Sequence, residues 1–466
     1  MRPTHKQFAF FRHAKNFARS TASHIRALTR TDAQWMLLIL FLALLVRIPF
    51  LSYPDRTVFD EAIYVNYTIH TVHKVPFFDI HPPLARMLFA EVADNTPIAT
   101  EVIPVFTNMP FSDFPYERVR LFVALCGVML PLIIYTIGRM LGYSTRMAGF
   151  SALFVVFDNA LILYSRLMLP DMLMIVASFT GMALVLALMR STSVQGRILL
   201  ALLAGIFFGG AVSIKWTAFA VLAFAALWLL FRRFNKEALA VVSVACFMYI
   251  AIFVLCFTNF TNGGKIDPIV GSLDTEWIAS TQFPKADNMT AILSSLPDYH
   301  RLILRANTDP EVIVETLWAP GPWSWPAARS KQNFWKNDDH TKSIELTGND
   351  VLWFGSFFVF LFEVAWIGWM RIRHRKWSVD EVEAMLLIGY MMNFLPFFLI
   401  HRPMFLYHYF TALIFLFLLM PRVAPRIVNC INALADDRYI GHVLVYGTCV
   451  LMLVNFFLLL PTTFGF

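Results

Sequence analysis

The chain has 466 residues, of which 58% are hydrophobic and only 15% charged, and its mean hydropathy is +0.61. Soluble globular domains carry about 25% charged residues, so this composition excludes an ordinary soluble domain and predicts an integral membrane protein. The formal charge of +7 lies mostly in short loops and the N-terminal segment, which is typical of membrane topology, and we expect no nucleic-acid partner.

Cysteine usage excludes two further classes of protein. The cysteines lie within or beside apolar runs and lack CxxC spacing, so neither a disulfide framework nor a zinc site is indicated. We therefore expect five free thiols, at Cys126, Cys246, Cys256, Cys430 and Cys449.

The chain begins with a basic segment, residues 1–32, which we expect in the cytoplasm. The apolar run that follows lacks an obvious small-residue cleavage site, so we expect it to remain as a signal anchor. A transmembrane helix needs about 20 apolar residues. The sequence offers about eleven such segments, at 33–52, 118–140, 146–164, 169–190, 197–212, 214–232, 238–258, 351–370, 381–400, 404–421 and 440–461.

Lysine and arginine in the short loops indicate the orientation, because they accumulate on the cytoplasmic side. With eleven spans, the basic stretches 371–377 and 421–426 fall on that side, the N-terminus is cytoplasmic and the C-terminus extracytoplasmic. The predicted fold is an all-α polytopic membrane protein with seven spans in 33–258, four in 351–466, and large extracytoplasmic loops at 53–117 and 259–350. Loops longer than about 15 residues usually have a function, so we expect the active site there.

Charged residues gather at the outer ends of the predicted spans. Asp60 and Glu61 follow the first span, and further charged residues follow later spans, namely Arg166, Asp171, Lys215 and Arg402. Charges near membrane depth are costly and usually functional, although arginine and lysine also snorkel toward lipid headgroups. Cations that face carboxylates predict a lipid-linked phosphate donor and a carboxylate general base. The alternative for the acid pair is a solvated loop or a helix cap.

The sequence DIHPPL at 79–84 has two interpretations. Asp79 and His81 are potential metal ligands, but two ligands without a clear third are poor evidence for a site, so we predict no metal. Pro82 and Pro83 favour a stiff turn at the start of a helix, with His81 available to substrate. In the second large loop Trp318, Trp323 and Trp325 either stack on a sugar or lie at the membrane interface.

Six motifs together resemble one known family, the protein O-mannosyltransferases of glycosyltransferase family 39. In chain order they are FDE (59–61), FFDIHPPL (77–84), ERVRLFVALCG (117–127), DNALILYSRLMLPD (158–171), SIKW (213–216) and FLYHYF (405–410). The resemblance implies a C-type glycosyltransferase (GT-C) fold and inverting transfer of mannose from a dolichyl or polyprenyl phosphate to Ser or Thr hydroxyls on the extracytoplasmic face.

The resemblance also suggests roles for single residues. It implies that Asp60 is the general base, with Glu61 beside it as a second catalytic residue, and that Arg120 contacts the donor, with Arg118 as the alternative register. Together with the charge argument, this predicts a donor-phosphate site formed by Arg120, Arg166, Lys215 and Arg402. Substrate or loop positioning is predicted for Asp79, His81, Asp171, Trp216 and His408.

The family needs no cofactor beyond the lipid-phosphate sugar cosubstrate, and the expected partners are that donor, an acceptor protein or peptide, and membrane lipids. Eukaryotic members carry a β-trefoil repeat domain in the second large loop, and residues 259–350 are too few for it. This favours a bacterial or archaeal cell membrane. Two alternatives remain: an aminoarabinose-transferase-like enzyme that modifies a glycolipid, and a transporter. Against a transporter, the spans lack a pair of Gly/Pro-broken helices.

Overall fold

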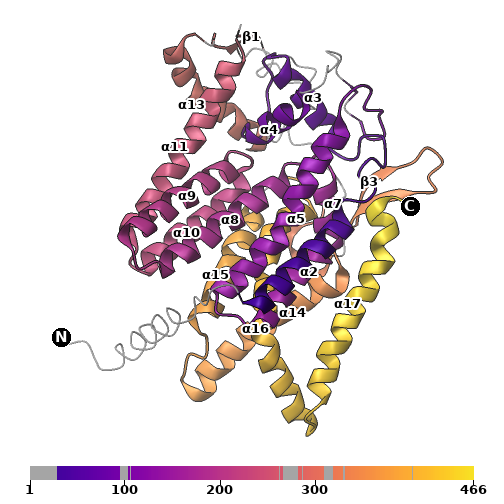
Figure 1. Cartoon of the computed structure of the whole chain (residues 1–466), viewed down its shortest axis with the longest axis vertical. Coiled ribbons are helices and arrows are strands. Elements are labelled where there is room, and N and C mark those ends of the chain that lie inside the picture. The colour runs from indigo at the N-terminus through magenta and orange to yellow at the C-terminus, as the bar shows by residue number, and fades with distance from the viewer. Residues whose placement is uncertain are drawn as a thin grey trace.

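The structure is a computed structural model, and it describes residues 29–94, 103–104, 106–261, 263–265, 282–285, 287–308, 319–328, 331–400 and 402–466. Helices dominate it (Figure 1). The first half contains α2 (Arg30–Arg47), α3 (Glu61–Val72), α4 (Leu84–Ala93), α5 (Tyr116–Met140), α6 (Thr145–Val156), α7 (Asn159–Arg166), α8 (Asp171–Arg190), α9 (Val194–Val212), the 3₁₀ helix η1 (Trp216–Ala218), α10 (Phe219–Phe231) and α11 (Asn235–Asn259).

The second half combines long helices with short strands and 3₁₀ turns. Its helices are α13 (Met289–Thr308), η3 (Pro322–Ala327), α14 (Asp350–His374), α15 (Glu381–Phe394), η4 (Leu395–Leu399), η5 (Leu406–Tyr409), α16 (Phe410–Ala435) and α17 (Ile440–Phe464). Its strands form two antiparallel pairs, β1 (Gly264–Lys265) with β2 (Gln282–Phe283), and β3 (Gln332–Lys336) with β4 (Ser343–Leu346).

The helices follow the predicted spans in order. Within the described residues, eight are long and apolar enough to cross a membrane, and the bent pair α6 and α7, with a 60° angle between them, is a ninth candidate. The other two predicted spans correspond to α2, which includes the charged Arg30, Asp32 and Arg47, and to the shorter apolar helix Trp216–Phe231. The protein is thus a multi-pass helical membrane protein, and the number of eleven crossings stays a prediction.

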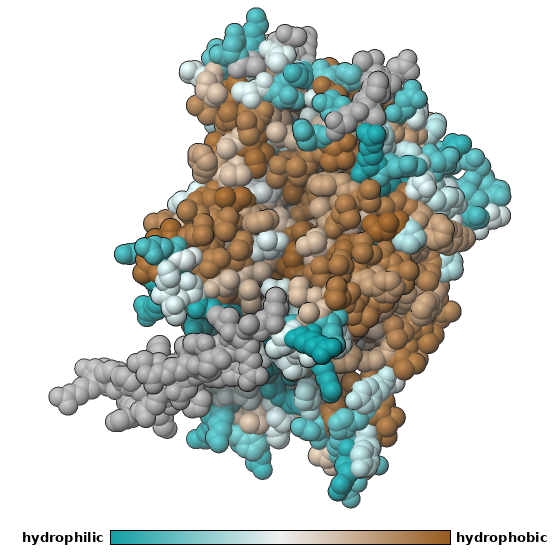
Figure 2. Space-filling model, viewed as in Figure 1, coloured by the Kyte–Doolittle hydropathy of each residue, from teal (hydrophilic) through white to brown (hydrophobic). Residues whose placement is uncertain are grey.

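The surface divides into a hydrophobic band and two polar ends. Figure 2 shows a broad band of hydrophobic side chains between hydrophilic groups at the top and bottom of the view. Helices α3, α4 and α13 lie at the upper end, and strand β3 lies below them on the right of the view, next to the C-terminus (Figure 1). Both predicted outer loops therefore contribute to the same end of the molecule.

Small residues allow close helix packing inside the band. Gly205 and Gly209 form a G-x-x-x-G pattern on α9, and they face α11. A Cβ atom added at Gly205 would lie 2.6 Å from the Cβ of Val244, and one at Gly209 would lie 2.7 Å from the Cβ of Met248. Such contacts are typical of membrane helices, which associate largely by packing backbones closely. Of these two helices, α9 ends three residues before Lys215.

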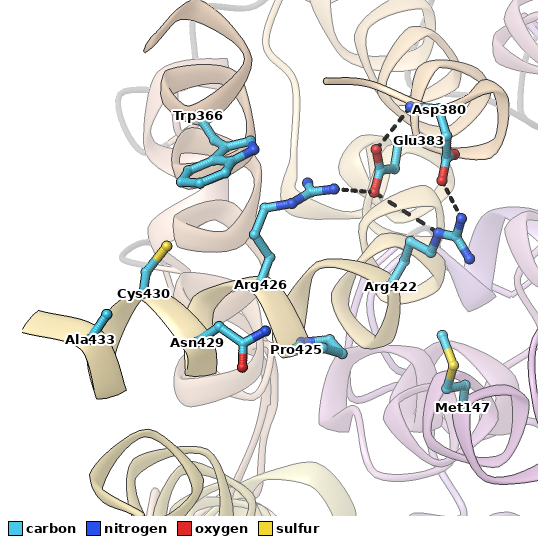
Figure 3. A pocket seen from close by; sticks show the side chains of 10 residues that line it. All are labelled: Met147, Trp366, Asp380, Glu383, Arg422, Pro425, Arg426, Asn429, Cys430 and Ala433. Carbon is cyan, nitrogen blue, oxygen red and sulfur yellow. Dashed lines mark hydrogen bonds and ion pairs between the residues drawn. The ribbon is translucent and has the colours of Figure 1, made fainter. Parts of the chain in front are cut away.

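The lower end contains a cluster of ion pairs around a cavity of about 700 Å³ (Figure 3). Arg422 and Arg426 of α16 point toward the start of α15, where Asp380 and Glu383 form a capping box. Arg422 pairs with Asp380, and Arg426 lies 2.8 Å from Glu383 and also pairs with Glu363 of α14. These paired charges connect three helices, and we call them the inner cluster.

Candidate active site

Three charged residues that are far apart in sequence meet at the outer end. Asp60 directly precedes α3, Asp171 begins α8, and Lys215 follows α9. The Lys215 ammonium lies 2.9 and 3.0 Å from the two carboxylate oxygens of Asp171, and both side chains are buried. Lys215 also lies 4.6 Å from the ring centroid of Tyr407, a cation–π contact. We call Asp60, Asp171, Lys215 and Tyr407 the outer site.

Asp60 differs from the other carboxylates at this end. Its carboxyl group is partly exposed, and within the described part of the chain it accepts no hydrogen bond. The pKa of Asp60 is raised to about 6, mainly because its surroundings desolvate the carboxyl group; the positive charge of Lys215 lowers the pKa, and the negative charge of Asp171 raises it. A carboxyl group with this pKa is ionised at neutral pH yet remains basic enough to accept a proton from a hydroxyl.

Glu61 has a different environment, although it is the next residue. Its fully buried carboxylate accepts hydrogen bonds from the backbone N–H of Val58 at 3.0 Å and of Met168 at 2.8 Å. The Arg120 guanidinium adds two more, at 2.9 and 2.7 Å. These four contacts favour a structural role for Glu61 over the predicted catalytic one, because they occupy both carboxylate oxygens.

Arg120 is committed to the protein in the same way. Besides Glu61, its guanidinium donates hydrogen bonds to three backbone carbonyls, those of Leu51, Pro54 and Arg56. All five N–H groups thus have partners, and the side chain is fully buried. These contacts argue against the phosphate-binding role predicted for Arg120, because no donor is left. Arg118, the alternative register, is exposed to solvent.

Arg166 also binds backbone rather than an open site. Its guanidinium donates to the carbonyls of Arg47, Pro49 and Phe50, and it lies 4.1 Å from the ring centroid of Phe464. These contacts connect α7 to the end of α2 and to the end of α17. They argue against the direct phosphate contact predicted for Arg166.

Arg402, His81 and His408 lie near Lys215. Desolvation, followed by the positive charges of Lys215 and Arg402, holds the pKa of His81 well below its usual range, so this imidazole is neutral at pH 7. Arg402 is partly exposed and donates to the Asn307 side chain of α13. His408 is buried, and its ring packs parallel to that of Trp325. Lys215 and Arg402 are therefore the predicted cations best placed for an anionic substrate.

Asp79 and His81 form part of a stiff loop. Asp79 accepts hydrogen bonds from the Arg86 guanidinium at 2.7 Å and from the backbone N–H of His81 at 2.8 Å. The backbone N–H of Asp79 in turn donates to the Tyr299 hydroxyl of α13 at 3.3 Å. These contacts support the predicted positioning role. Among the described residues no three His, Cys, Asp or Glu side chains are grouped as metal ligands.

The tryptophans of the two outer regions have different environments. Trp216 donates to the Tyr249 hydroxyl at 2.9 Å, which lies 2.9 Å from His300 of α13. Trp325 is fully buried and donates to the Pro320 carbonyl, so neither predicted interpretation holds for it. Trp323 is exposed, and Trp318 lies outside the described residues. All five cysteines are free thiols, as predicted.

Several residues of the site were missed from the sequence. Arg86 lies two residues beyond the motif that contains Asp79, in the first turn of α4, and its spacing at the start of a helix was a usable signal. Tyr164, whose buried hydroxyl has no hydrogen-bond partner in the described structure, lies beside Tyr407 with 5.3 Å between ring centroids. Aromatic residues are so frequent in this chain that no sequence signal set this pair apart.

Two family models match the chain. The model for dolichyl-phosphate-mannose-protein mannosyltransferase matches residues 37–262, and the model for the C-terminal four-transmembrane region of protein O-mannosyltransferase matches residues 294–466. The chain belongs to the protein O-mannosyltransferase family. The predicted resemblance is thereby confirmed, and the two matched regions include all the motifs on which it was based.

Curated relatives of this family member come from fungi and flies. The chain is 36% identical over 127 residues to dolichyl-phosphate-mannose–protein mannosyltransferase 1 of Schizosaccharomyces pombe, covering 27% of this chain and 14% of that protein. It is 28% identical over 261 residues to protein O-mannosyltransferase 1 of Drosophila pseudoobscura pseudoobscura, covering 51% and 28%. The chain thus spans less than a third of the length of these two relatives.

Solved structures confirm the predicted GT-C fold. The Saccharomyces cerevisiae protein O-mannosyltransferase Pmt1–Pmt2 complex bound to the sugar donor matches with a TM-score of 0.78 at 16% identity, covering 96% of this chain and 92% of that one. ArnT from Cupriavidus metallidurans bound to undecaprenyl phosphate matches with a TM-score of 0.51 at 14% identity, covering 84% and 60%. At these identities the likeness concerns the fold alone.

Proposed function

We propose that this protein is an inverting glycosyltransferase that moves mannose from a dolichyl or polyprenyl phosphate to Ser or Thr hydroxyls of proteins on the extracytoplasmic face. The observation that carries the proposal is the carboxyl group of Asp60, which has no hydrogen-bond partner among the described residues and lies close to the Lys215–Asp171 pair, in a member of the mannosyltransferase family. A base without a protein partner, next to a cation, suits proton removal close to a phosphate ester.

In this mechanism the acceptor oxygen attacks the anomeric carbon of mannose on the face opposite the phosphate, and Asp60 takes the hydroxyl proton. The bond from the anomeric carbon to the phosphate oxygen breaks, and the lipid phosphate leaves with the electron pair. A single displacement of this kind inverts the configuration. No covalent sugar–enzyme intermediate forms.

Lys215 and Arg402 stabilise the charge that develops on the phosphate. An ammonium group has three N–H donors. Lys215 donates to both carboxylate oxygens of Asp171, which uses two of the three donors. We propose that the third donor is directed to a phosphate oxygen. Asp171 thus positions Lys215, while Glu61 and Arg120 hold the loop that ends in Asp60. The neutral His81 is available to donate or accept a hydrogen bond with the sugar.

We also propose the orientation that the basic loops predict, with the N-terminus in the cytoplasm and the C-terminus outside. A bacterial or archaeal host remains part of this proposal because residues 259–350 are too few for the β-trefoil repeat domain, although the curated relatives named above are eukaryotic. The outer site would then face the compartment into which acceptor proteins are exported. Protease protection of tags at the two termini tests the orientation.

The direct test uses the full chain in membranes, radiolabelled mannosyl phosphodolichol and a Ser/Thr peptide. We expect label on the peptide with wild-type protein and a loss of about 10² to 10⁴-fold in Asp60→Asn, the usual effect of removing a general base. Asp55→Asn is the matched control, because Asp55 is an exposed acid in the same loop. If Asp60→Asn turned over as fast as wild type, Asp60 would not be the general base. If label appeared on a glycolipid and not on the peptide, the acceptor would be a lipid and not a protein.

A further inference from the structure

Phe59, the residue before Asp60, has an unusual backbone conformation. Its φ is +52°, in the left-handed region that a bulky side chain rarely adopts. Such conformations persist only when the surroundings hold them, and they are concentrated at functional sites. Because Asp60 is the next residue, the contacts that hold the backbone of Phe59 also fix the direction in which the Asp60 side chain points.

Phe334 of β3 makes two contacts with Phe59. The backbone N–H of Phe59 donates to the Phe334 carbonyl at 3.0 Å. The two rings stack with 4.0 Å between centroids and an interplanar angle of 4°. Phe334 itself is buried, with 1% exposure, so its ring has little freedom to move away.

The strand pairing explains why Phe334 is free to make these contacts. In the β3–β4 hairpin Asn333 pairs with Glu345 and Trp335 pairs with the next residue, Ile344, so the register shifts at Phe334. A residue in a β-bulge is left out of the ladder, and bulges next to active sites re-aim a side chain. Here the bulge leaves the Phe334 carbonyl available to the first outer loop.

The same hairpin holds that loop at a second point. The Trp335 indole N–H donates to the Asn108 side chain at 2.8 Å. The backbone N–H of Asn108 donates to the carbonyl of Thr57 at 2.8 Å. Thr57 lies two residues before Phe59, so the hairpin holds the segment that leads into Asp60 at two points, directly at Phe59 and through Asn108 at Thr57.

We propose that Phe334 is a positioning residue for Asp60, acting through the strained Phe59. The inference rests on the proposed function, in which Asp60 is the general base. It assigns the β3–β4 hairpin, in the second outer loop, the task of aiming a group in the first outer loop. Phe405 and Tyr407 also contact the Phe59 ring edge-on, with 6.1 and 6.3 Å between ring centroids.

Turnover is the first readout. We expect Phe334→Ala to lower kcat by about 10²-fold, the effect of a small misplacement of a reacting group, with KM for the donor nearly unchanged. Phe334→Tyr keeps the ring and the backbone carbonyl, so it should restore kcat. Phe154→Ala is the control, because it removes a ring from the bundle, packed against Phe417, and should lower Tm without a selective loss of kcat.

A double-mutant cycle tests whether the two rings act as a unit. Phe59→Gly removes one ring, and glycine adopts a positive φ without strain. If the two rings act through their stacking contact, the double variant Phe59→Gly/Phe334→Ala should lose no more kcat than the single variant with the larger loss. Independent, multiplied losses would overturn the proposal, as would a Phe334→Ala variant with wild-type kcat.

The charge state of Asp60 gives a readout that does not need turnover. The titratable groups around Asp60 are Lys215, Asp171, Tyr64, Tyr67, Tyr164 and Tyr407. Without the Phe334 ring, water reaches Asp60, and its titration should move from about 6 toward that of an ordinary carboxyl group. Carbodiimide labelling of Asp60 against pH, followed by mass spectrometry, measures this shift.

These readouts separate the two proposals. If wild-type protein transfers no mannose, the proposed function fails, and carboxyl labelling still tests the placement of Asp60. If wild-type protein is active and Phe334→Ala matches it in both kcat and labelling profile, the positioning role fails alone. An unchanged labelling profile in Phe334→Ala overturns the inference in either case.

Discussion

The outer site and the inner cluster contain the same kinds of side chain, yet they use them differently. In the inner cluster each carboxylate of Asp380, Glu383 and Glu363 has an arginine partner on α16. At the outer end Asp60 has no such partner in the part of the chain that the structure describes, although Glu61 beside it has four hydrogen bonds. Paired charges connect helices, whereas a carboxylate left without a partner remains able to bind a proton. Single substitutions in the outer site and in the inner cluster test this difference.

The largest expected effect separates the two neighbouring acids. Asp60→Asn should lower turnover by about 10² to 10⁴-fold and leave Tm unchanged or higher. Burial has raised the pKa of Asp60 from 3.8 to about 6, so above pH 6 its charge destabilises the folded state, and the amide removes that charge. Differential scanning fluorimetry in detergent and the transfer assay measure both quantities. A fall in Tm would show that Asp60 is structural.

Loss of the Arg120 partner should mainly affect stability. Arg120→Met leaves the Glu61 carboxylate buried without its ion pair, which typically costs about 3–5 kcal/mol. Reduced expression and a lower Tm are the expected results. Arg118→Met is the matched control, since Arg118 is exposed two positions earlier. If instead Arg120→Met folded normally and lost only donor affinity, the original phosphate-binding prediction would return.

The pH profile tests the state of Asp60. A general base must be ionised, so kcat should fall about tenfold for each pH unit below the pKa of about 6. The sign follows from the raised pKa, because protonation of Asp60 begins at a higher pH than for an exposed carboxyl group. Turnover measured from pH 4.5 to 8 on the same membranes gives this acidic part of the pH profile. The control is that the sugar donor stays intact in every buffer used. A flat profile down to pH 4.5 contradicts it.

The smallest effect is expected in the inner cluster. Arg422 is 32% exposed at its side chain and pairs with Asp380, and partly exposed ion pairs are worth about 0–1 kcal/mol. Arg422→Gln should therefore lower Tm slightly and leave kcat per folded molecule unchanged. A selective loss of kcat in this variant would show that the inner cluster is coupled to the outer site and is not purely structural.

Much of this arrangement was predictable because hydropathy and loop charges act locally. The order of the helices and the shared position of Asp60, Asp171 and Lys215 at one end follow from apolar segments and basic loops. The partners of Arg120 and Arg166 did not follow, because they are backbone carbonyls brought close only by tertiary packing. Charge and position alone could not separate Asp60 from Glu61, because both are acids in the same loop; only the family resemblance distinguished them, and their different environments come from tertiary packing.

The hairpin illustrates the same limit. Nothing in the run QNFWK indicates that Phe334 leaves the ladder, because a bulge depends on how β3 meets β4. Likewise, Trp325 resembles an interfacial residue in sequence, but the ring cluster of Phe397, His408 and Tyr409 encloses it. Long-range aromatic packing of this kind leaves no periodic signal.

The bulge at Phe334 has a consequence for protein engineering. A one-residue slip of a strand turns every side chain to the other face, so a deletion within β3 would remove Phe334 from Phe59. The turn at Asp339, His340 and Thr341 is exposed and lies beyond the last paired residues. Extra domains or epitopes can therefore be grafted onto the tip of the hairpin, whereas its base tolerates no change in length.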